Sequence, residues 1–350
     1  MPIKERDRIW GWLYGGAVGG ALGAAVRFDE PDAIVRKYGE SGPAEFTGVL
    51  GRPGALITPV QQTLMGVDAM IRAHLRTTWF RYRTDPWYEV IHALRRWLLA
   101  EQNGWLPTHT ELYVRRWADR TTLEALRARV LDDLEGISDE PVNSSQGNAA
   151  LNVAGVAALW SDDPEFVFGL GARIAMLTHG HPNAYLSAGA YAVMVNYLMS
   201  SNHRLRAVDA ARAVLVKWDH HEEVLAALTK AVDGVLTDQR PLTPEVLAEL
   251  GDSNTAMGAL AIAIRASESD HRFHPTVAKA ITISGDSATT GFLTGSLVGL
   301  SCEYATISAD LVGQLELSKE IGTLANCAFD EFAGEPDRSE SFLESFPFSS

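Results

Sequence analysis

The side chains best placed for chemistry lie early in the stretch Ile283–Leu300, where one carboxylate precedes three hydroxyls: Asp286, Ser287, Thr289 and Thr290. The apolar run that follows has glycine at every fourth position, namely Gly291, Gly295 and Gly299. This pattern predicts a polar loop that enters a tightly packed helix. A helix N-terminus presents free N–H groups and partial positive charge, which suit phosphates and carboxylates. The stretch therefore indicates either an anion or metal site or a capped core helix.

Two further groups of side chains have metal-ligand chemistry. Asp219–Glu223 reads D-H-H-E-E, a charged run that is typical of a solvated helix face. Asp270-His271 with His274 has an i, i+3 histidine spacing. We expect neither group to form a metal site. No P-loop, G-x-S-x-G or H-E-x-x-H motif is present, and no predicted strand precedes the glycines of Gly15–Gly23, as a dinucleotide fingerprint requires.

The elements that must position these side chains are helical almost throughout. Apolar residues recur at the helical period in three runs, Leu64–Leu75, Trp87–Leu98 and Ala184–Leu198. Helix starts are indicated where a capping side chain precedes proline, at Asp85-Pro86, Asp163-Pro164 and Thr243-Pro244. The sequence predicts an all-α protein with one compact multi-helix domain over residues 1–333 and a mobile C-terminal tail over residues 334–350.

Composition excludes some partners and indicates a compartment. The net charge of −14 over 350 residues argues against nucleic-acid partners, which require basic patches. Only two cysteines are present, Cys302 and Cys327, which indicates a reducing, cytoplasmic location. Ile9–Val26 carries no charge, so a short membrane helix or a signal peptide is an alternative to a buried helix. Its many glycines and alanines favour the buried helix, and no membrane partner is expected.

Four ordered motifs carry a resemblance to a known family. They are G-W-L-Y-G-G-A-V-G-G-A-L-G-A-A-V-R-F from Gly11, I-T-P-V-Q-Q-T-L-M from Ile57, N-S-S-Q-G-N-A-A from Asn143 paired with L-T-H-G-H-P from Leu177, and G-D-S-A-T-T-G from Gly285. Over roughly residues 8–330 the chain resembles the ADP-ribosylglycohydrolase family. The resemblance implies a compact all-α domain with a cleft built from loops between helices. It also implies two Mg²⁺ ions that assist cleavage of the bond between ADP-ribose and a protein side chain.

The metal ligands of that family are largely missing from this sequence. The family's T/S-D-D pattern reads Thr58-Pro59-Val60, and its D-x-D-T/S pattern reads Asp286-Ser287-Ala288-Thr289. Pro59, Val60 and Ala288 therefore replace carboxylates, which leaves a degenerate set of Thr58, Asp286 and Thr289. Near the first motif, a glutamate that is common in the family is replaced by Arg27. Because Mg²⁺ takes its affinity from carboxylates, we expect no resident cofactor, or at most one weakly bound Mg²⁺.

Other parts of the implied cleft are better preserved. The resemblance assigns ligand binding to Asn143, Ser145, Gln146, Gly147 and Asn148, as a loop that cradles a diphosphate with its N–H groups. It places His179 and Gly180, from T-H-G, beside the ligand. After the loop, the family's methionine-arginine pair reads Leu151-Asn152, which departs from the pattern.

Three functional hypotheses follow. The first is a pseudoenzyme that binds ADP-ribose, a related nucleotide or a protein partner, in the control of ADP-ribosylation or in protection against a toxin; its limiting case is a scaffold with no ligand. The second is an active glycohydrolase in which Asp286 is the residual catalytic group, a general base aided by Thr58 and His179. The third is a membrane-anchored protein that uses the glycines of Gly15–Gly23 for helix pairing.

Overall fold

The structure is a computed structural model that describes residues 5–346 except 80, 82–83, 104–111, 113, 117, 131–139, 239 and 303. Over these residues the chain forms α-helices and short 3₁₀ helices with no β-strand, which confirms the predicted all-α class. The α-helices are α1 (Arg6–Ala24), α2 (Pro31–Tyr38), α3 (Thr58–Thr78), α4 (Pro86–Asn103), α5 (Arg120–Val130), α6 (Pro164–Met176), α7 (Pro182–Leu198), α8 (Arg204–Leu215), α9 (Glu222–Leu236), α10 (Pro244–Ala248), α11 (Ala256–Ser267), α12 (Phe273–Ile281), α13 (Ser287–Ser301), α14 (Ala309–Gln314), α15 (Ser318–Phe332) and α16 (Glu340–Ser345). The 3₁₀ helices are η1 (Val49–Gly51), η2 (Asn148–Leu151), η3 (Ala154–Leu159) and η4 (Tyr304–Thr306).

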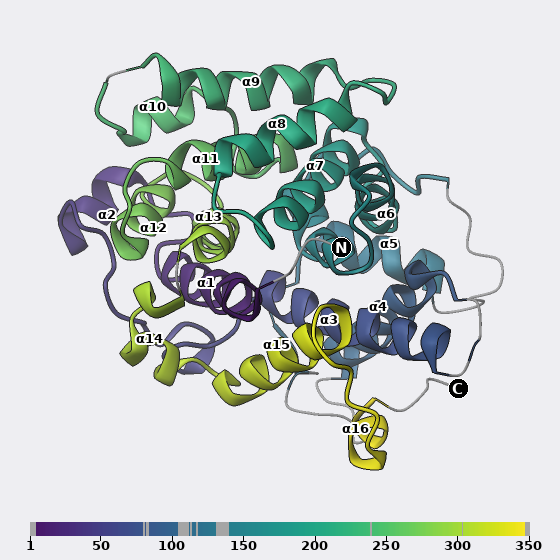
Figure 1. The fold of residues 1–350 in the computed structure, drawn as a ribbon. Coiled ribbons are helices and arrows are strands. Elements are labelled where there is room, and N and C mark those ends of the chain that lie inside the picture. The colour runs from purple at the N-terminus through teal and green to yellow at the C-terminus, as the bar shows by residue number, and fades with distance from the viewer. Residues whose placement is uncertain are drawn as a thin grey trace.

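The centre of the fold is an antiparallel pair of helices, α1 and α13, which lie side by side in Figure 1. Glycines face each other along this pair at such close range that side chains would not fit. A Cβ atom added to Gly19 would lie 2.1 Å from the carbonyl oxygen of Gly291. The same holds for Gly11 opposite Gly299, where the distance would be 1.9 Å. Glycine is therefore required here for close approach of two backbones.

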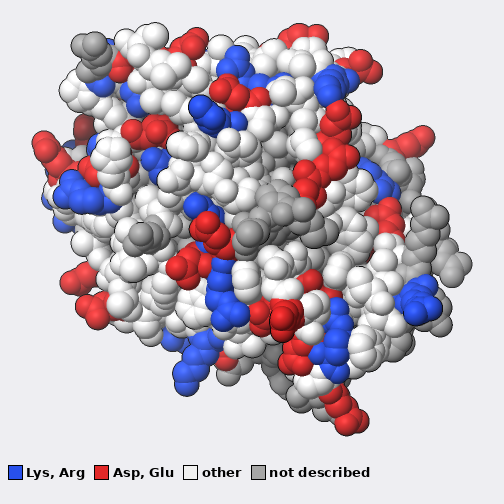
Figure 2. Space-filling view, in the orientation of Figure 1, with Lys and Arg blue, Asp and Glu red and all other residues white. Residues whose placement is uncertain are grey.

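The remaining helices surround this pair. α13 also packs against α11 and α12, while α1 packs against α3 and α15. α7 joins α6 and α8, and α9 lies on α11. In Figure 1, α8, α9 and α10 form the upper edge of the molecule, and α15 and α16 lie below α1. Acidic and basic side chains are interspersed over the face shown in Figure 2.

The predicted helix starts are confirmed. α4, α6 and α10 begin at Pro86, Pro164 and Pro244. The Asp163 side chain accepts a hydrogen bond from the Glu165 N–H, and Thr243 accepts one from the Val246 N–H, so both act as N-caps. The uncharged stretch Ile9–Val26 is the buried helix α1 and the turn after it. Within the described part of the chain, no helix has the length and apolar character needed to cross a membrane.

The described part of the predicted tail contacts the helical body. Arg338 forms an ion pair with Glu331 of α15, at 2.5 Å between Nη1 and Oε2. Phe342 and Phe346 are buried, and their ring centroids lie 5.1 Å apart. Residues 347–350 lie outside the described residues. The mobility of the tail stays a prediction.

Candidate functional site

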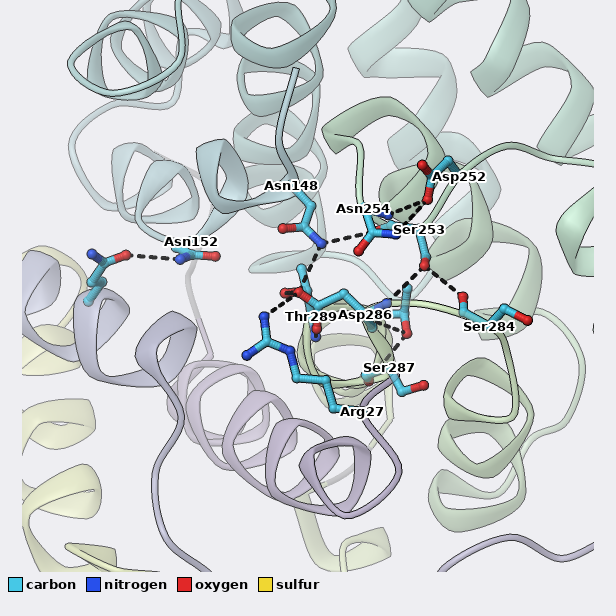
Figure 3. A network of polar contacts seen from close by, with 12 residues as sticks. Arg27, Asn148, Asn152, Asp252, Ser253, Asn254, Ser284, Asp286, Ser287 and Thr289 are labelled. Carbon is cyan, nitrogen blue, oxygen red and sulfur yellow. Dashed lines mark hydrogen bonds and ion pairs between the residues drawn. The ribbon is translucent and has the colours of Figure 1, made fainter. Parts of the chain in front are cut away.

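The side chain of Asp286 is the centre of a buried polar network at the start of α13 (Figure 3). Its Oδ1 atom accepts a hydrogen bond from the Thr289 N–H at 3.2 Å, so Asp286 is the N-cap of α13. Its Oδ2 atom accepts from the Thr289 hydroxyl at 3.0 Å and from the Asn148 amide at 3.1 Å. The Asp286 N–H donates to the Ser253 hydroxyl at 3.0 Å. Neighbouring segments thus hold this carboxylate in one orientation.

A cation reaches the same carboxylate from the end of α1. Arg27 Nη2 lies 3.0 Å from Asp286 Oδ2, and the Arg27 side chain is 24% exposed while that of Asp286 is only 4% exposed. The pair therefore joins a buried anion to a cation at the mouth of the site. The Arg27 guanidinium also lies over the Phe28 ring, 4.7 Å from its centroid.

This network borders a small cavity. The cavity has a volume of about 30 Å³, which is room for about two water molecules. Its lining joins segments from six parts of the chain: Ala24 and Arg27, Leu50, Ile57, Thr58 and Pro59, Asp119, Asn148, Ala149 and Asn152, and Asp286, Ala288 and Thr289. The structure thus brings the predicted Thr58, Pro59, Asn148, Asp286, Ala288 and Thr289 together around one space.

Several polar atoms of the lining are buried and have no hydrogen-bond partner among the described residues. They are Thr58 Oγ1, Asn152 Oδ1, Asp119 Oδ2 and Arg27 Nε. Thr58 is 5% exposed and Asn152 is 3% exposed, so solvent at the surface does not satisfy them. In Figure 3 the Asn152 oxygen faces the side of Asn148 and Asp286, away from the partner of its amide nitrogen. Because an unpaired buried polar group is costly, these atoms mark a site for water or for a polar group of a ligand.

The cavity adjoins a wider, open groove of about 850 Å³. Ala24, Arg27, Leu50 and Asp119 line both spaces. Phe28 lines the groove with a ring that is 61% exposed. Leu50 and Phe28 both have left-handed backbone conformations, with φ of 58° and 66°. Such values are uncommon outside glycine and often mark a functional loop.

The donor set does not fit a pair of Mg²⁺ ions. Of the residues that line the cavity, Asp286 and Asp119 alone carry carboxylates, and Arg27 already pairs with Asp286. Pro59 and Ala288 present apolar surface, and Val60 is buried without lining the cavity. Across the described residues, no group of three or more His, Cys, Asp and Glu is arranged to hold a metal ion. Two Mg²⁺ ions would have to share these two carboxylates, one of which is already paired with a cation.

The loop before η2 is held together by its own side chains. Asn143 Oδ1 accepts from the Ser145 N–H at 2.9 Å and from the Gly180 N–H at 3.2 Å. The Asn143 amide donates to the Thr178 carbonyl oxygen at 2.9 Å, and the Ser145 hydroxyl accepts from the Gly147 N–H. Two N–H groups of the predicted diphosphate cradle, those of Ser145 and Gly147, and the Gly180 N–H are thus used inside the protein. The role of these residues toward a ligand stays a prediction.

The rest of the predicted ligand set lies around the same loop. The Gln146 side chain lies 3.3 Å from the His181 ring and the Gln146 carbonyl oxygen accepts from the Ala256 N–H, which ties the loop to α7 and α11. Gly147 lies directly against the His179 ring, because a Cβ at Gly147 would be 3.0 Å from His179 Nε2. His179 Nδ1 lies 2.8 Å from the Thr178 hydroxyl. Burial lowers the pKa of His179, although the charge of Asp119 partly opposes this shift.

Asp119 and Asn152, whose side-chain oxygens have no partner among the described residues, line the cavity but were not among the predicted site residues. Asp119 Oδ1 accepts from the Thr122 N–H at 2.8 Å, so in sequence this aspartate reads as an ordinary cap of α5. Asn152 follows η2, and its amide donates to the Gln62 side chain at 2.9 Å. Nothing in the local sequence distinguishes the free oxygens of these two residues from ordinary polar atoms. Packing alone turns them toward the cavity.

Comparisons with known proteins agree with this architecture. A model of the ADP-ribosylglycohydrolase family matches residues 1–338. A solved structure described as an ADP-ribosylglycohydrolase-related protein complex is similar to this chain with a TM-score of 0.66 and 20% sequence identity. The match covers 94% of this chain and 99% of that one, and at this identity it shows a shared fold. No curated protein sequence matches the chain.

Proposed function

The chain belongs to the ADP-ribosylglycohydrolase family, and we propose that it binds ADP-ribose or a related nucleotide in its cleft without two-metal hydrolysis. The observation that carries this proposal is the set of unpartnered, buried polar atoms around the cavity, led by Thr58 Oγ1 and Asn152 Oδ1. Polar groups of a bound ligand would satisfy these atoms in place of the water for which the cavity has room.

The chemistry of these atoms favours the hydroxyl groups of a sugar. Among these unpartnered atoms, the Arg27 Nε–H is a hydrogen-bond donor, Asn152 Oδ1 and Asp119 Oδ2 are acceptors, and the Thr58 hydroxyl is both. A sugar hydroxyl also donates and accepts, so it matches a mixed lining better than a phosphate, which accepts only. The small cavity would take the hydroxyl-bearing end of the ligand. The remainder would lie in the outer groove, whose volume of about 850 Å³ is within the usual range for small-molecule sites.

The proposed impairment of hydrolysis rests on other residues of the same cavity lining. Asp286 accepts four hydrogen bonds, one of them from a cation, so its oxygens are poorly placed to take a proton from water. Pro59 and Ala288 supply no ligands, which removes the electrostatic help that a metal pair gives to the reaction. The cleft is therefore suited to bind a ligand without hydrolysing it.

Isothermal titration of the purified protein with ADP-ribose in EDTA tests this proposal. We expect a metal-independent binding isotherm, and weaker binding of ADP, which lacks the terminal ribose. Addition of Mg²⁺ should leave the affinity for ADP-ribose unchanged. Binding that appears only with Mg²⁺, or no binding of ADP-ribose at all, would refute the proposal.

One observation favours a residual hydrolase as the second candidate. Asp119 Oδ2 is a buried carboxylate oxygen with no partner in the described part of the chain, beside the cavity that would hold a reacting water. It is therefore better placed than Asp286 to act as a general base. Release of free ADP-ribose from an ADP-ribosylated protein would support this candidate if Asp119→Asn abolished it. Equal rates with and without the protein would exclude it.

A cleft that binds ADP-ribose without cleaving it fits the control of ADP-ribosylation, including protection against an ADP-ribosylating toxin. In that setting the partner is a protein that carries ADP-ribose. We expect the chain to bind an ADP-ribosylated protein more tightly than the unmodified form, and free ADP-ribose to compete. Equal binding of both forms would argue against this setting.

A further inference from the structure

We propose that Arg27 is the resident cation of this cleft: a tethered guanidinium that balances the buried Asp286 charge and excludes a divalent metal ion. The proposal explains how the site keeps one buried carboxylate after the family's metal ligands have been lost. It concerns the charge balance within the cleft and stands whether or not the cleft binds ADP-ribose.

The first support is the occupancy of Asp286 Oδ2 by hydrogen-bond donors. A carboxylate has about four lone-pair directions for hydrogen bonds. Asp286 receives four donors: the Thr289 N–H on Oδ1, and on Oδ2 the Thr289 hydroxyl, the Asn148 amide and the Arg27 guanidinium. Oδ2 is therefore fully occupied, whereas Oδ1 accepts a single hydrogen bond, and a metal ion on Oδ2 would have to displace one of its three donors. Arg27 is the one whose side chain reaches in from the partly exposed mouth.

The second support is the way in which the backbone delivers Arg27 to Asp286. The Phe28 N–H donates to the Gly285 carbonyl oxygen at 2.8 Å, which ties the end of α1 to the residue before Asp286. Phe28 takes a left-handed conformation with φ of 66°, and its ring lies under the Arg27 guanidinium. These contacts hold the cation in place before any ligand arrives. A dissolved ion competing for Asp286 has to give up translational freedom that Arg27 has already lost.

The third support is electrostatic. The Asp286 side chain is 4% exposed, so an isolated charge there would be poorly solvated. Removal of one partner from a buried ion pair leaves an uncompensated charge and is strongly destabilising. The arginine therefore supplies, within the chain, the positive charge that metal ions would bring. A metal would meet repulsion from Arg27 in addition to the shortage of carboxylates.

The experiment compares wild type, Arg27→Ala, Arg27→Lys and the double variant Arg27→Ala/Asp286→Asn. Thermal unfolding is followed in EDTA and in Mn²⁺, and bound Mn²⁺ is measured by electron paramagnetic resonance. We expect Arg27→Ala to lower Tm by several degrees in EDTA, and Mn²⁺ to restore part of that loss and to bind. Wild type and Arg27→Lys should show neither the rescue nor the bound ion, because both retain a cation.

The double variant is the control for the anion. Without the Asp286 charge it should bind no Mn²⁺, and its Tm should not respond to the metal. Should Arg27→Ala fail to fold, Arg27→Gln removes the charge while it keeps most of the side-chain volume, and the same rescue is expected. The proposal is overturned if wild type binds Mn²⁺ as tightly as Arg27→Ala or Arg27→Gln does. It is also overturned if these two single variants neither lose stability nor bind the ion.

Discussion

Gly15 of α1 lies directly against Gly295 of α13: a Cβ atom on Gly15 would be 2.2 Å from the Gly295 carbonyl oxygen. The same contact repeats along the antiparallel pair and ends with Gly23 opposite Ser287. In this register the end of α1 lies next to the start of α13. Arg27, which follows the last of these glycines, therefore meets Asp286, which precedes Ser287. The packing of two glycine-rich helices thus builds the charged centre of the site.

A methyl group at this contact should destabilise the whole protein. In Gly295→Ala the new Cβ would lie 2.1 Å from the Gly15 carbonyl oxygen, so the two backbones must move apart. We expect a loss of at least about 2 kcal/mol in the free energy of unfolding by urea. Gly313→Ala is the matched control, because an exposed helical glycine with no atom within 4 Å of an added Cβ should gain up to about 1 kcal/mol. Similar effects of both substitutions would contradict this account of the helix pair.

Thr58 should matter for binding and not for stability. Its buried hydroxyl has no partner among the described residues, so Thr58→Val should change the free energy of unfolding by less than about 1 kcal/mol. The same substitution should weaken ADP-ribose binding about three- to tenfold by calorimetry, because one hydrogen bond to the ligand is lost. Thr63→Val is the comparison, since the Thr63 hydroxyl bonds to the Asn152 carbonyl oxygen at 2.5 Å. That variant should lose about 1–3 kcal/mol of stability. The prediction fails if Thr58→Val destabilises the protein as much as Thr63→Val does.

Asn143 should act as the organiser of its loop. Asn143→Ala removes the acceptor for two partly buried N–H groups and a donor to the Thr178 carbonyl oxygen. We expect a loss of about 1–3 kcal/mol in chemical denaturation. Hydrogen exchange should also become faster at Ser145 and Gly180, whose N–H groups lose their partner. Asn202→Ala, at an exposed position, should change stability by less than about 0.5 kcal/mol. Unchanged exchange in the Asn143 variant would show that the backbone alone holds the loop.

His179 should make the fold sensitive to mild acid. Burial lowers its pKa in the folded protein below the ordinary value of 6.5, so the unfolded chain binds a proton first as the pH falls. Stability from this residue is therefore complete above pH 6.5 and declines as the pH falls below it, down to the lowered pKa. His179→Gln removes the titrating group, and its stability should depend less on pH than that of wild type between pH 7.5 and 5 in urea titrations. Since burial also lowers the pKa of His92, the difference between the two proteins is the decisive quantity. Parallel pH profiles would rule out this role for His179.

Much of the fold could be predicted from the sequence because its signals are local. A capping side chain before proline marks a helix start within three residues, as at Asp163 and Thr243. The helical period of apolar residues indicates which face of each helix is buried. Asp286 could be recognised as a helix cap because its partner, the Thr289 N–H, lies only three residues away.

The site was less predictable because its parts come from distant segments. Arg27 and Asp286 are 259 positions apart, and the antiparallel glycine contact decides that they meet. The sequence shows that Pro59 and Ala288 stand where carboxylates are expected, but it does not show that an arginine faces the remaining one.

Local sequence by itself therefore determined the helices and their caps, since each depends on residue types and short spacings, and the family resemblance added the prediction that metal ligands are missing. Tertiary structure alone decided which polar atoms remain without a partner. Asp119 satisfies one oxygen locally through the Thr122 N–H, and Asn152 satisfies its amide nitrogen through the distant Gln62. Each leaves its other atom beside the cavity without a partner among the described residues, because separate segments pack around it. Whether a buried oxygen is satisfied depends on everything that surrounds it, and no short stretch of sequence contains that information.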